Sequence, residues 1–258
     1  MTTYRFINPT ARLTDDLAER SAGLWGYHWL GSRCVFGCGL LVRGFLTSNS
    51  PNTLRERRAA LDDIYGSTAP EERSWFEQTP QHSLEAIASC GIPPERPLVD
   101  VGGGTSALVD ALLQRGWQDP TILDVSAKAI TQAKTRMGED AARIHWIVAD
   151  VRTWQPKRQY GLWHDRAVLH FLTDPTQRRA YVTTLRTALA VGGCALISGF
   201  GPAGPDQCSR LPVERTDAAG LAALLGKGFA LVSSATIVHR TPWDAEQSFV
   251  AATFRRMG

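Results

Sequence analysis

The fold of this chain is decided by the stretch Pro97-Leu-Val-Asp-Val-Gly-Gly-Gly-Thr-Ser-Ala107. Residues 98–101 are typical of a short buried strand, the glycines at 102–104 of a tight turn, and the apolar residues that recur from Leu108 onward of a helix. Glycines let the backbone turn sharply and let a ligand lie directly against it. The start of a helix offers free N–H groups to a carboxylate or a phosphate. The stretch therefore predicts a nucleotide-like ligand at the turn.

Downstream of this stretch, strand-like and helix-like segments alternate. We expect strands at residues 98–101, 121–125, 143–149, 161–166 and 194–200, and helices at 106–115, 126–137, 174–190 and 216–225. Such alternation is typical of a parallel, doubly wound sheet. Two further strand-like segments, 229–238 and 248–254, leave no room for a crossover helix between them, so we expect them to pair antiparallel. The pattern predicts an α/β, Rossmann-like fold that is mostly parallel and ends in an antiparallel C-terminal hairpin.

The N-terminal part of the chain divides into two segments. Residues 1–52 show no clear period, and we treat them as an extension that is loosely packed or partly disordered. Residues 53–92 contain helix-like stretches at 53–66 and 83–90, which we expect to cover the active site of a main domain that spans residues 53–258.

Two other interpretations of residues 1–52 stay open. The segment mixes aromatic side chains with glycines, as an interfacial or partner-binding segment would. Alternatively, because no Met lies between Met1 and Met137, the natural protein would start near Val42 or Leu54 from a non-ATG codon. An N-terminal peptide that begins at residue 2, found in protein made from the native gene, would exclude such a start.

Composition is that of a cytoplasmic globular protein. Hydrophobic residues make up 43% of the sequence, enough for a packed core, and the net charge of +3 does not favour a nucleic-acid partner. The five cysteines are scattered, and Cys34-x-x-x-Cys38 has no second Cys or His pair nearby, so we expect reduced thiols and no metal site.

The N-terminus is too polar and acidic for a secretory signal. The apolar run at residues 34–46 contains Arg43 and falls short of the ~20 apolar residues that a membrane span needs.

The glycine turn fits two classes of cofactor loop. Gly102, Gly104 and Ala107 satisfy the G-x-G-x-x-G/A pattern of dinucleotide-binding proteins. They fit equally well the looser glycine loop of enzymes that use S-adenosylmethionine. The residues at the neighbouring strand ends decide between the two.

Carboxylates stand at the ends of three successive strands of the expected sheet, at Asp100, Asp124 and Asp150. Asp124 is suited to accept hydrogen bonds from both hydroxyls of a ribose. Asp150 is suited to accept one from an adenine amino group, while the N–H of Val151 meets a ring nitrogen. Three negative charges would serve a pyrophosphate poorly and a cationic sulfonium well. Any one of these Asp residues is also explained as the cap of the helix that follows it. That explanation does not account well for three Asp residues at the ends of three successive strands.

Taken together, these pieces resemble the class I S-adenosylmethionine-dependent methyltransferases. The matching stretches are Val99-Asp-Val-Gly-Gly-Gly-Thr-Ser106, Leu123-Asp-Val-Ser126, Ala149-Asp-Val151, Leu189-Ala-Val-Gly-Gly-Cys-Ala-Leu-Ile197 and the closing hairpin, within residues 54–256. The resemblance implies a seven-stranded sheet of order 3-2-1-4-5-7-6 and S-adenosylmethionine as cofactor. It implies that Gly102 and Gly104 contact the methionyl part, Asp124 the ribose and Asp150 the adenine. The full set of cofactor-binding candidates is Asp100, Gly102, Gly103, Gly104, Asp124, Val125, Asp150 and Val151.

One position departs from the family pattern. Ser106 stands where many members have a third glycine, and serine is also a small residue.

A narrower resemblance concerns the N-terminal helices. Ile64-Tyr65, Ser74-Trp-Phe76 and Ser83-Leu84, together with Asp165-Arg166 after the fourth strand, look like methyltransferases of the elongation-factor-lysine group. That group carries Asp-Lys-Gly where this chain has Asp165-Arg-Ala167, and Lys and Arg are not interchangeable, so its substrate does not simply carry over. The aromatic pair at 75–76 would either form a lid over the acceptor or pack the first helices.

The acceptor side of the site is expected after the fourth and fifth strands. Our catalytic candidates there are His164, Asp165 and His170, and a base is needed only if the nucleophile arrives protonated. Structural explanations stay open beside these roles. His164 would pack against the sheet, Asp165 would pair with Arg166 or cap the next helix, and His170 would be a satisfied helix histidine.

The leading hypothesis is a cytoplasmic methyltransferase that acts on a small molecule or a protein side chain. One alternative is an NAD(P)-dependent oxidoreductase, against which stand the terminal hairpin and the absence of a Tyr-x-x-x-Lys pair. Retention of a nicotinamide cofactor without S-adenosylhomocysteine would favour it. The other alternative is a non-catalytic cofactor-binding module, which predicts cofactor binding that His164→Ala leaves unaffected and no turnover on any acceptor.

Overall fold

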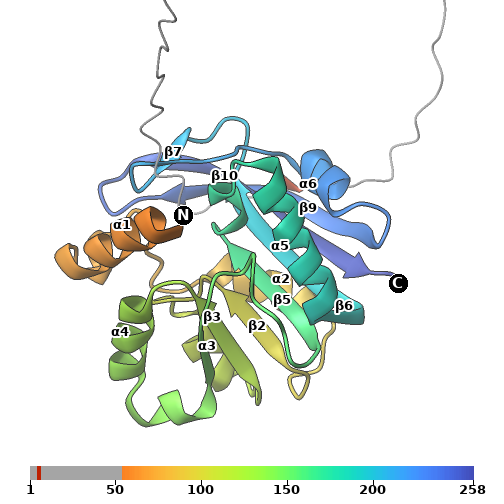
Figure 1. Cartoon of the computed structure of the whole chain (residues 1–258), viewed down its shortest axis with the longest axis horizontal. Helices are drawn as coiled ribbons and strands as arrows, with labels where there is room; N and C mark the ends of the chain where they lie inside the picture. The colour runs from red at the N-terminus through yellow and green to blue at the C-terminus, as the bar shows by residue number, and fades with distance from the viewer. Residues whose placement is uncertain (1–4, 7–53) are drawn as a thin grey trace, which may run out of the picture. The chain divides into compact units, whose positions relative to one another are not determined.

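The computed structural model of the chain describes residues 5–6 and 54–258. The predicted extension at residues 1–52, apart from Arg5–Phe6, and the pair Cys34 and Cys38 lie outside the described residues. The α-helices are α1 (Leu54–Ser67), α2 (Gln81–Ser89), α3 (Leu108–Gln114), α4 (Ala127–Met137), α5 (Pro175–Ala188) and α6 (Ala218–Leu225) (Figure 1). The strands are β1 (Arg5–Phe6), β2 (Leu98–Val101), β3 (Pro120–Asp124), β4 (His145–Val148), β5 (Tyr160–Arg166), β6 (Leu189–Phe200), β7 (Gln207–Cys208), β8 (Leu211–Pro212), β9 (Phe229–Arg240) and β10 (Glu246–Arg256).

The main sheet has the strand order β1-β9-β10-β6-β5-β2-β3-β4. Strands β4, β3, β2, β5 and β6 pair in parallel, and the antiparallel hairpin of β9 and β10 joins β6 through β10. Without β1, this is the 3-2-1-4-5-7-6 order that the resemblance implies, so the predicted fold class is confirmed. The added strand β1 pairs antiparallel with Ala235 and Thr236 of β9. It was not predicted, because two residues are too few to leave a period in the sequence.

Several element boundaries differ from the prediction for local reasons. Helix α3 begins at Leu108, because the hydroxyl of Ser106 accepts the N–H of Leu108 at 3.1 Å and holds the preceding residues in a turn. Strand β6 begins at Leu189, which pairs with Tyr160 of β5 across a shift in register. The β7–β8 hairpin and the 3-10 turn Leu169–Phe171 were missed, because elements this short lack periodicity.

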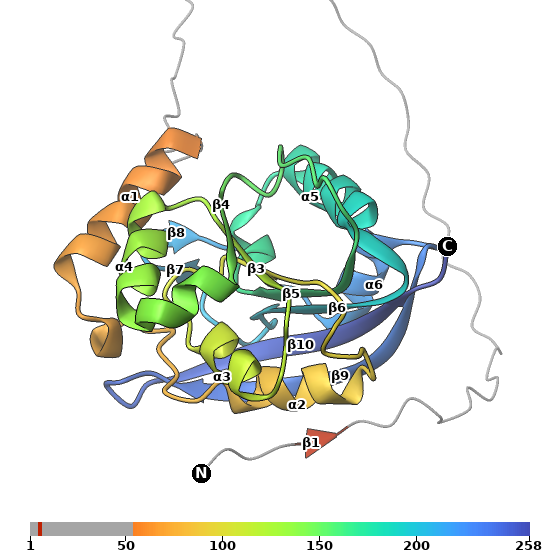
Figure 2. The same cartoon turned by 90° about the horizontal axis from the view of Figure 1, so that it is seen from below.

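Helices pack on both faces of the sheet (Figure 2). On one face, α5 and α6 form a cluster with β5, β6 and β10 that contains the fully buried Trp163, Tyr181 and Phe254. On the other, α2 and α3 pack against β2, β5 and β6 around Leu108 and Leu162. Each such side chain contributes about 1.5–3 kcal/mol by leaving water. These two layers fix the carboxyl ends of the central strands, where the site lies.

Hydrogen bonds attach helix α1 to the N-cap and the middle of α4. The hydroxyl of Ser126, the N-cap of α4, donates to Asp62 Oδ1 at 2.5 Å, and Gln132 Nε2 donates to the carbonyl oxygen of Tyr65 at 2.6 Å. The chain that follows α1 is thereby brought to the carboxyl end of the sheet. Among the helices of residues 54–258, none combines the length and apolar character needed to cross a membrane.

Candidate functional site

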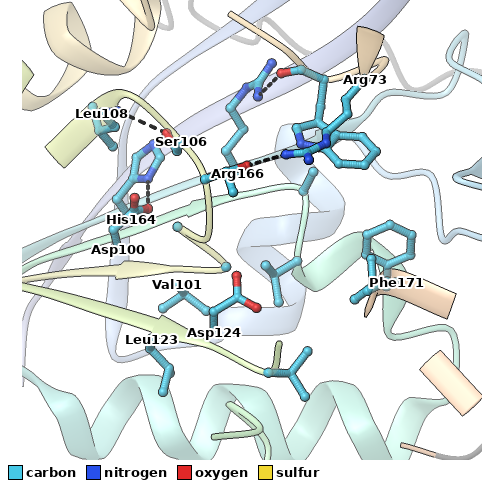
Figure 3. Close-up of a pocket in the computed structure, with 18 of the residues that line it drawn as sticks. Arg73, Asp100, Val101, Ser106, Leu108, Leu123, Asp124, His164, Arg166 and Phe171 are labelled. Carbon is cyan, nitrogen blue, oxygen red and sulfur yellow. Dashed lines mark hydrogen bonds and ion pairs between the residues drawn. The ribbon is translucent and has the colours of Figure 1, made fainter. Parts of the chain in front are cut away.

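A cavity of about 290 Å³ opens where β2, β3 and β5 end (Figure 3). Its polar lining includes the carboxylates of Asp100, Asp124 and Asp150, from three neighbouring strand ends. Its apolar lining comes from α1, from the segment between α1 and α2, from the central elements around the glycine turn and from the loops after β5 and β6. The large apolar side chains of this lining include Leu61, Tyr65, Trp75, Phe76, Leu108, Leu123, Phe171, Leu172 and Leu211.

The glycine turn leaves no room for side chains beside two of these carboxylates. A Cβ on Gly103 would lie 2.5 Å from Asp100 Oδ2, and one on Gly104 would lie 2.8 Å from Asp124 Oδ2. Gly104 also has a φ of +32°, which side chains other than glycine rarely adopt. Gly102 and Gly103 line the cavity, whereas Gly104 lies outside its lining and makes space for Asp124.

Asp100 belongs to a buried hydrogen-bonded row. Its Oδ1 lies 2.7 Å from Nδ1 of His164, which is its register partner on β5, and His164 Nε2 lies 2.9 Å from the hydroxyl oxygen of Ser83 on α2. All three side chains line the cavity and are at most 7% exposed. The second oxygen, Oδ2, is buried and has no hydrogen-bond partner among the described residues. A cationic donor in the cavity would satisfy that oxygen.

Asp124 is buried at the end of β3. Its Oδ1 accepts the N–H of Ser126 at 2.8 Å. Burial raises the pKa of Asp124 to about 7, and the nearby Asp100 carboxylate adds to the rise, against the lowering effect of the Ser126 N–H. Burial makes the charged form of this carboxylate costly, and hydrogen bonds from a ligand would offset that cost. The carboxylate is therefore suited to a ligand with two hydroxyl donors, such as a ribose.

Asp150 and Val151 line the cavity, and so does Val125. The Asp150 carboxylate is already bound by Arg152, whose Nε lies 2.9 Å and whose Nη2 lies 2.5 Å from Asp150 Oδ2. The side chains of both residues are largely buried. A ligand amino group at Asp150 would therefore have to share or displace this pair.

Arg73 is a cavity residue that the sequence analysis missed. It is 3% exposed, and its Nη1 donates to Thr105 Oγ1 at 2.9 Å while its guanidinium lies 4.9 Å from the ring centre of Tyr65. Burial lowers the pKa of this guanidinium from its ordinary value. Its Nε is buried without a hydrogen-bond partner, and no described carboxylate lies within ion-pair distance. Arg73 follows no helical period and precedes the glycine turn by some 30 residues, so no local pattern marked it.

Arg166 attaches the aromatic segment to the sheet. Its Nη2 lies 2.9 Å from Glu77 Oε1, and its Nη1 donates to the carbonyl oxygen of Trp75 at 3.0 Å. His239 Nε2 of β9 donates to the carbonyl oxygen of Ser74 at 2.6 Å. These contacts hold Trp75 at the cavity wall, and Arg166 pairs with Glu77 instead of Asp165.

Of the three catalytic candidates, His164 lines the cavity, and Asp165 and His170 do not. Successive strand residues point to opposite faces, so Asp165 points away from His164 and Arg166. Its carboxylate accepts the N–H groups of Val168 and Leu169 and the hydroxyl of Tyr181, at 2.6–3.1 Å, and burial raises its pKa to about 6. This is the capping role that the sequence left open.

His170 is packed against aromatic rings. Its ring centre lies 4.4 Å from that of Phe171 and 5.0 Å from that of Phe200. Burial lowers its pKa to about 3, so the ring is neutral at physiological pH. The structure thus separates His170 from the cavity and keeps it in the core.

The polar groups of the cavity that lack a partner indicate which kind of ligand it can bind. The other three arginines of the cavity lining are each paired with a carboxylate. Arg73 instead donates to neutral oxygens, from Nη1 to Thr105 and from Nη2 to the carbonyl oxygen of Thr68, and its Nε has no partner among the described residues. Its charge is therefore not balanced by a described carboxylate. A fitting ligand carries an anion for Arg73, a cation for Asp100 Oδ2 and a diol for Asp124. The amino-acid and ribose parts of S-adenosylmethionine offer this combination, whereas a pyrophosphate would face the carboxylates.

Comparisons with known proteins agree with this chemistry. A family model described as a methyltransferase domain matches residues 98–193. Nodulation protein S of Rhizobium tropici is 28% identical over 169 residues, which cover 66% of this chain and 66% of that protein. Nodulation protein S of Sinorhizobium fredii is 32% identical over 165 residues, which cover 64% of this chain and 72% of that protein.

A solved structure shares the fold. The N-methyltransferase NodS of Bradyrhizobium japonicum, in complex with S-adenosyl-L-homocysteine, has a TM-score of 0.58 and 17% identity, over 77% of this chain and 97% of that one. The sheet order, the family match and the identity to the Sinorhizobium protein point to one family and one cofactor. This chain belongs to the class I methyltransferases that use S-adenosylmethionine.

Proposed function

We propose that this enzyme transfers the methyl group of S-adenosylmethionine to a small molecule with an apolar body. The observation that carries the proposal is the aromatic lining of Trp75, Phe76 and Phe171 in the same cavity as the three strand-end carboxylates. Cavities that bind small molecules are mostly apolar with a few polar groups that fix orientation. The Bradyrhizobium neighbour is an N-methyltransferase, which makes an amine the first acceptor to test.

Each part of the cofactor is bound by a different residue near the glycine turn. Asp124 binds the ribose, Asp100 Oδ2 receives the ammonium group of the methionyl part, and Arg73 receives its carboxylate. The adenine lies near Asp150 and Val151, where Arg152 has to give up part of its contact with Asp150. The orphaned atoms of Asp100 and Arg73 support this assignment, because a buried polar atom without a partner is costly.

The chain's main contribution to the reaction is alignment. S-adenosylmethionine supplies a methyl group that its sulfonium already activates. The aromatic lining holds the acceptor, and the strand-end groups hold the donor, so two reactants meet in one geometry. Such alignment is worth about 7–11 kcal/mol of the barrier in favourable cases. We also propose a cytoplasmic location, which the free thiols of Cys90, Cys194 and Cys208 support.

Calorimetry and methyl transfer test this function in sequence. Titration with S-adenosylhomocysteine is expected to give micromolar binding, and NAD is expected to give none. Transfer from methyl-labelled S-adenosylmethionine is then measured on arylalkyl amines, on phenols and on a protein extract. Label found in protein alone would contradict the small-molecule acceptor, and tight binding without any transfer would favour a non-catalytic module.

Replacing Arg73 with alanine is expected to weaken S-adenosylhomocysteine binding by about 10- to 50-fold. A charge-assisted hydrogen bond is worth about 1.5–3 kcal/mol, and the lower half of that range applies to a guanidinium that already donates to Thr105 and Thr68. Arg73→Lys keeps the charge but loses the planar fork, so an intermediate affinity is expected. The control ligand is 5′-methylthioadenosine, which lacks the amino-acid part and should bind all three proteins alike. Calorimetric Kd values that rise equally for both ligands would contradict the carboxylate assignment.

A further inference from the structure

Ser83 presents an oxygen to the cavity at the end of the buried row described above. Its hydroxyl lies 2.9 Å from His164 Nε2, and His164 Nδ1 lies 2.7 Å from Asp100 Oδ1. Figure 3 shows the contact between His164 and Asp100 beside the cavity, with Phe171 across from them. The three residues come from α2, β5 and β2, so tertiary packing alone brings them into line.

The chemistry of Asp100, His164 and Ser83 determines which atom donates and which accepts in each of their hydrogen bonds. A carboxylate only accepts hydrogen bonds, so Asp100 requires the proton of His164 on Nδ1. The Nε2 atom is then an acceptor and takes the hydroxyl hydrogen of Ser83. The lone pairs of the Ser83 oxygen are left for a donor in the cavity. The row is therefore built to receive an N–H or O–H hydrogen at Ser83.

We propose that Ser83 is a catalytic residue that takes the proton of the acceptor, with His164 and Asp100 as positioning residues behind it. This rests on the proposed methyltransferase function and narrows its substrate class. The acceptor atom carries at least one hydrogen, as in a primary or secondary amine or a hydroxyl compound. Tertiary amines and thioethers, which have no such proton, are not substrates.

The step balances in atoms and electrons. The lone pair of the acceptor N or O forms the new bond to the methyl carbon, and the carbon–sulfur bond breaks with its electron pair left on sulfur. The acceptor proton moves to the Ser83 oxygen as the hydroxyl proton of Ser83 moves to His164 Nε2. The imidazolium that results is stabilised by the Asp100 carboxylate, which keeps its own charge.

A small second cavity gives the proton a way out after the transfer. It measures about 20 Å³, room for one water, and it shares Ser83, Glu77 and Arg166 with the main cavity. His239, whose Nε2 donates to the carbonyl oxygen of Ser74, also lines it. The proton on His164 Nε2 returns through Ser83 to this space, which restores the neutral His164 and the hydroxyl of Ser83.

Ser83→Ala is the direct test of the catalytic role. We expect kcat to fall about 10- to 50-fold while the acceptor KM and the affinity for S-adenosylhomocysteine stay within about twofold, because the alignment of the two reactants remains. Ser83→Thr restores the hydroxyl and should recover part of kcat. The matched control is Ser89→Ala, on the exposed end of the same helix, which should behave as wild type.

The acceptor class is tested with matched probes. Methyl-labelled S-adenosylmethionine is offered with phenethylamine, N-methylphenethylamine, N,N-dimethylphenethylamine, tyramine and a phenethyl methyl thioether. Transfer to the members with an N–H or O–H hydrogen, and to no other, supports the proposal. Transfer to the tertiary amine or the thioether, transfer to none of the five, or an unchanged kcat in Ser83→Ala overturns it. Each of these results leaves the methyltransferase function standing if S-adenosylhomocysteine still binds, whereas loss of that binding in the wild type removes the function itself.

A spectroscopic readout does not depend on turnover. Histidine ¹⁵N NMR of the full chain with bound S-adenosylhomocysteine should give a protonated Nδ1 and an unprotonated Nε2 for His164, assigned with the His164→Gln variant. The Nε2 signal should move in Ser83→Ala and stay in place in Ser89→Ala. A proton on Nε2 of the wild type at neutral pH would overturn the direction of the row.

Discussion

Replacing Gly103 with alanine is expected to weaken S-adenosylhomocysteine binding by about 100-fold or more, which corresponds to about 3 kcal/mol. The added Cβ would lie 2.5 Å from Asp100 Oδ2 and 2.9 Å from its Cγ, closer than van der Waals contact. Asp100 cannot turn away, because it is 2% exposed and its Oδ1 is held 2.7 Å from His164. The new methyl group competes with the space in which we propose that Oδ2 meets the cofactor's ammonium group. Calorimetric titration measures the loss.

Two controls separate this loss from damage to the fold. Gly66→Ala lies on α1, where the nearest atoms belong to the flexible end of Lys128, and alanine is favoured over glycine within a helix. This variant should bind as wild type. The ligand 5′-methylthioadenosine lacks the amino-acid part and should bind Gly103→Ala within a few-fold of wild type. Near-wild-type binding of S-adenosylhomocysteine to Gly103→Ala would contradict the assignment of Asp100.

The parts of the fold that short-range patterns encode were predictable from the sequence. The strand Leu98–Val101 followed by glycines was recognised with its bounds, because the glycine turn is local chemistry. The hairpin of β9 and β10 was inferred from the shortness of its connection, and the strand order followed from the family resemblance. The placing of Asp100, Asp124 and Asp150 at one cavity follows from parallel strands whose carboxyl ends share one edge.

The parts of the site that tertiary packing assembles could not be predicted. Arg73 lies 32 residues from its partner Thr105, and Ser83 lies 81 residues from His164. No spacing rule links residues so far apart, since α1 and α2 must first dock on the sheet. The contact between Asp150 and Arg152 is different, because the two residues are close in sequence and the arginine is a visible partner for the carboxylate.

The choice between His164 and Asp165 depended on the two faces of β5, whereas His170 lies beyond that strand, in the 3-10 turn Leu169–Phe171. A strand sequence reveals that neighbours point to opposite faces but not which face meets the cavity. The register of Asp100 with His164 supplies that information, since it puts His164 next to a carboxylate of the cavity. Asp165, one residue later, then falls on the side of Tyr181 and acts as a structural acceptor.

Cofactor affinity is expected to fall about 100-fold between pH 9 and pH 5 through the titration of Asp124, since each pH unit well below a pKa costs about tenfold. Burial raises the pKa of this carboxyl to about 7, and the neighbouring Asp100 and Asp62 add to the rise, while the N–H of Ser126 opposes it. The ionised form accepts hydrogen bonds from both ribose hydroxyls, and the protonated form gives up one acceptor site. Affinity therefore approaches its full value toward pH 9 and is lost as the pH falls through about 7, and binding near pH 6 releases a proton. Titration in two buffers of different ionisation enthalpy measures both effects.

The variant Asp124→Asn and a second ligand locate the titrating group. Asn keeps one acceptor oxygen without a charge to titrate, so its affinity should be lower at pH 8 and flat between pH 5 and pH 8, with no proton release. The ligand 5′-methylthioadenosine keeps the ribose, so wild type should bind it with the same pH dependence, which excludes Arg73 and the cofactor's amino-acid part as the source. A pH-independent affinity in wild type would mean that Asp124 does not hold the ribose. Proton release that persists in Asp124→Asn would assign the titration to another buried carboxyl, and Asp165, whose pKa burial raises to about 6, is the first to examine.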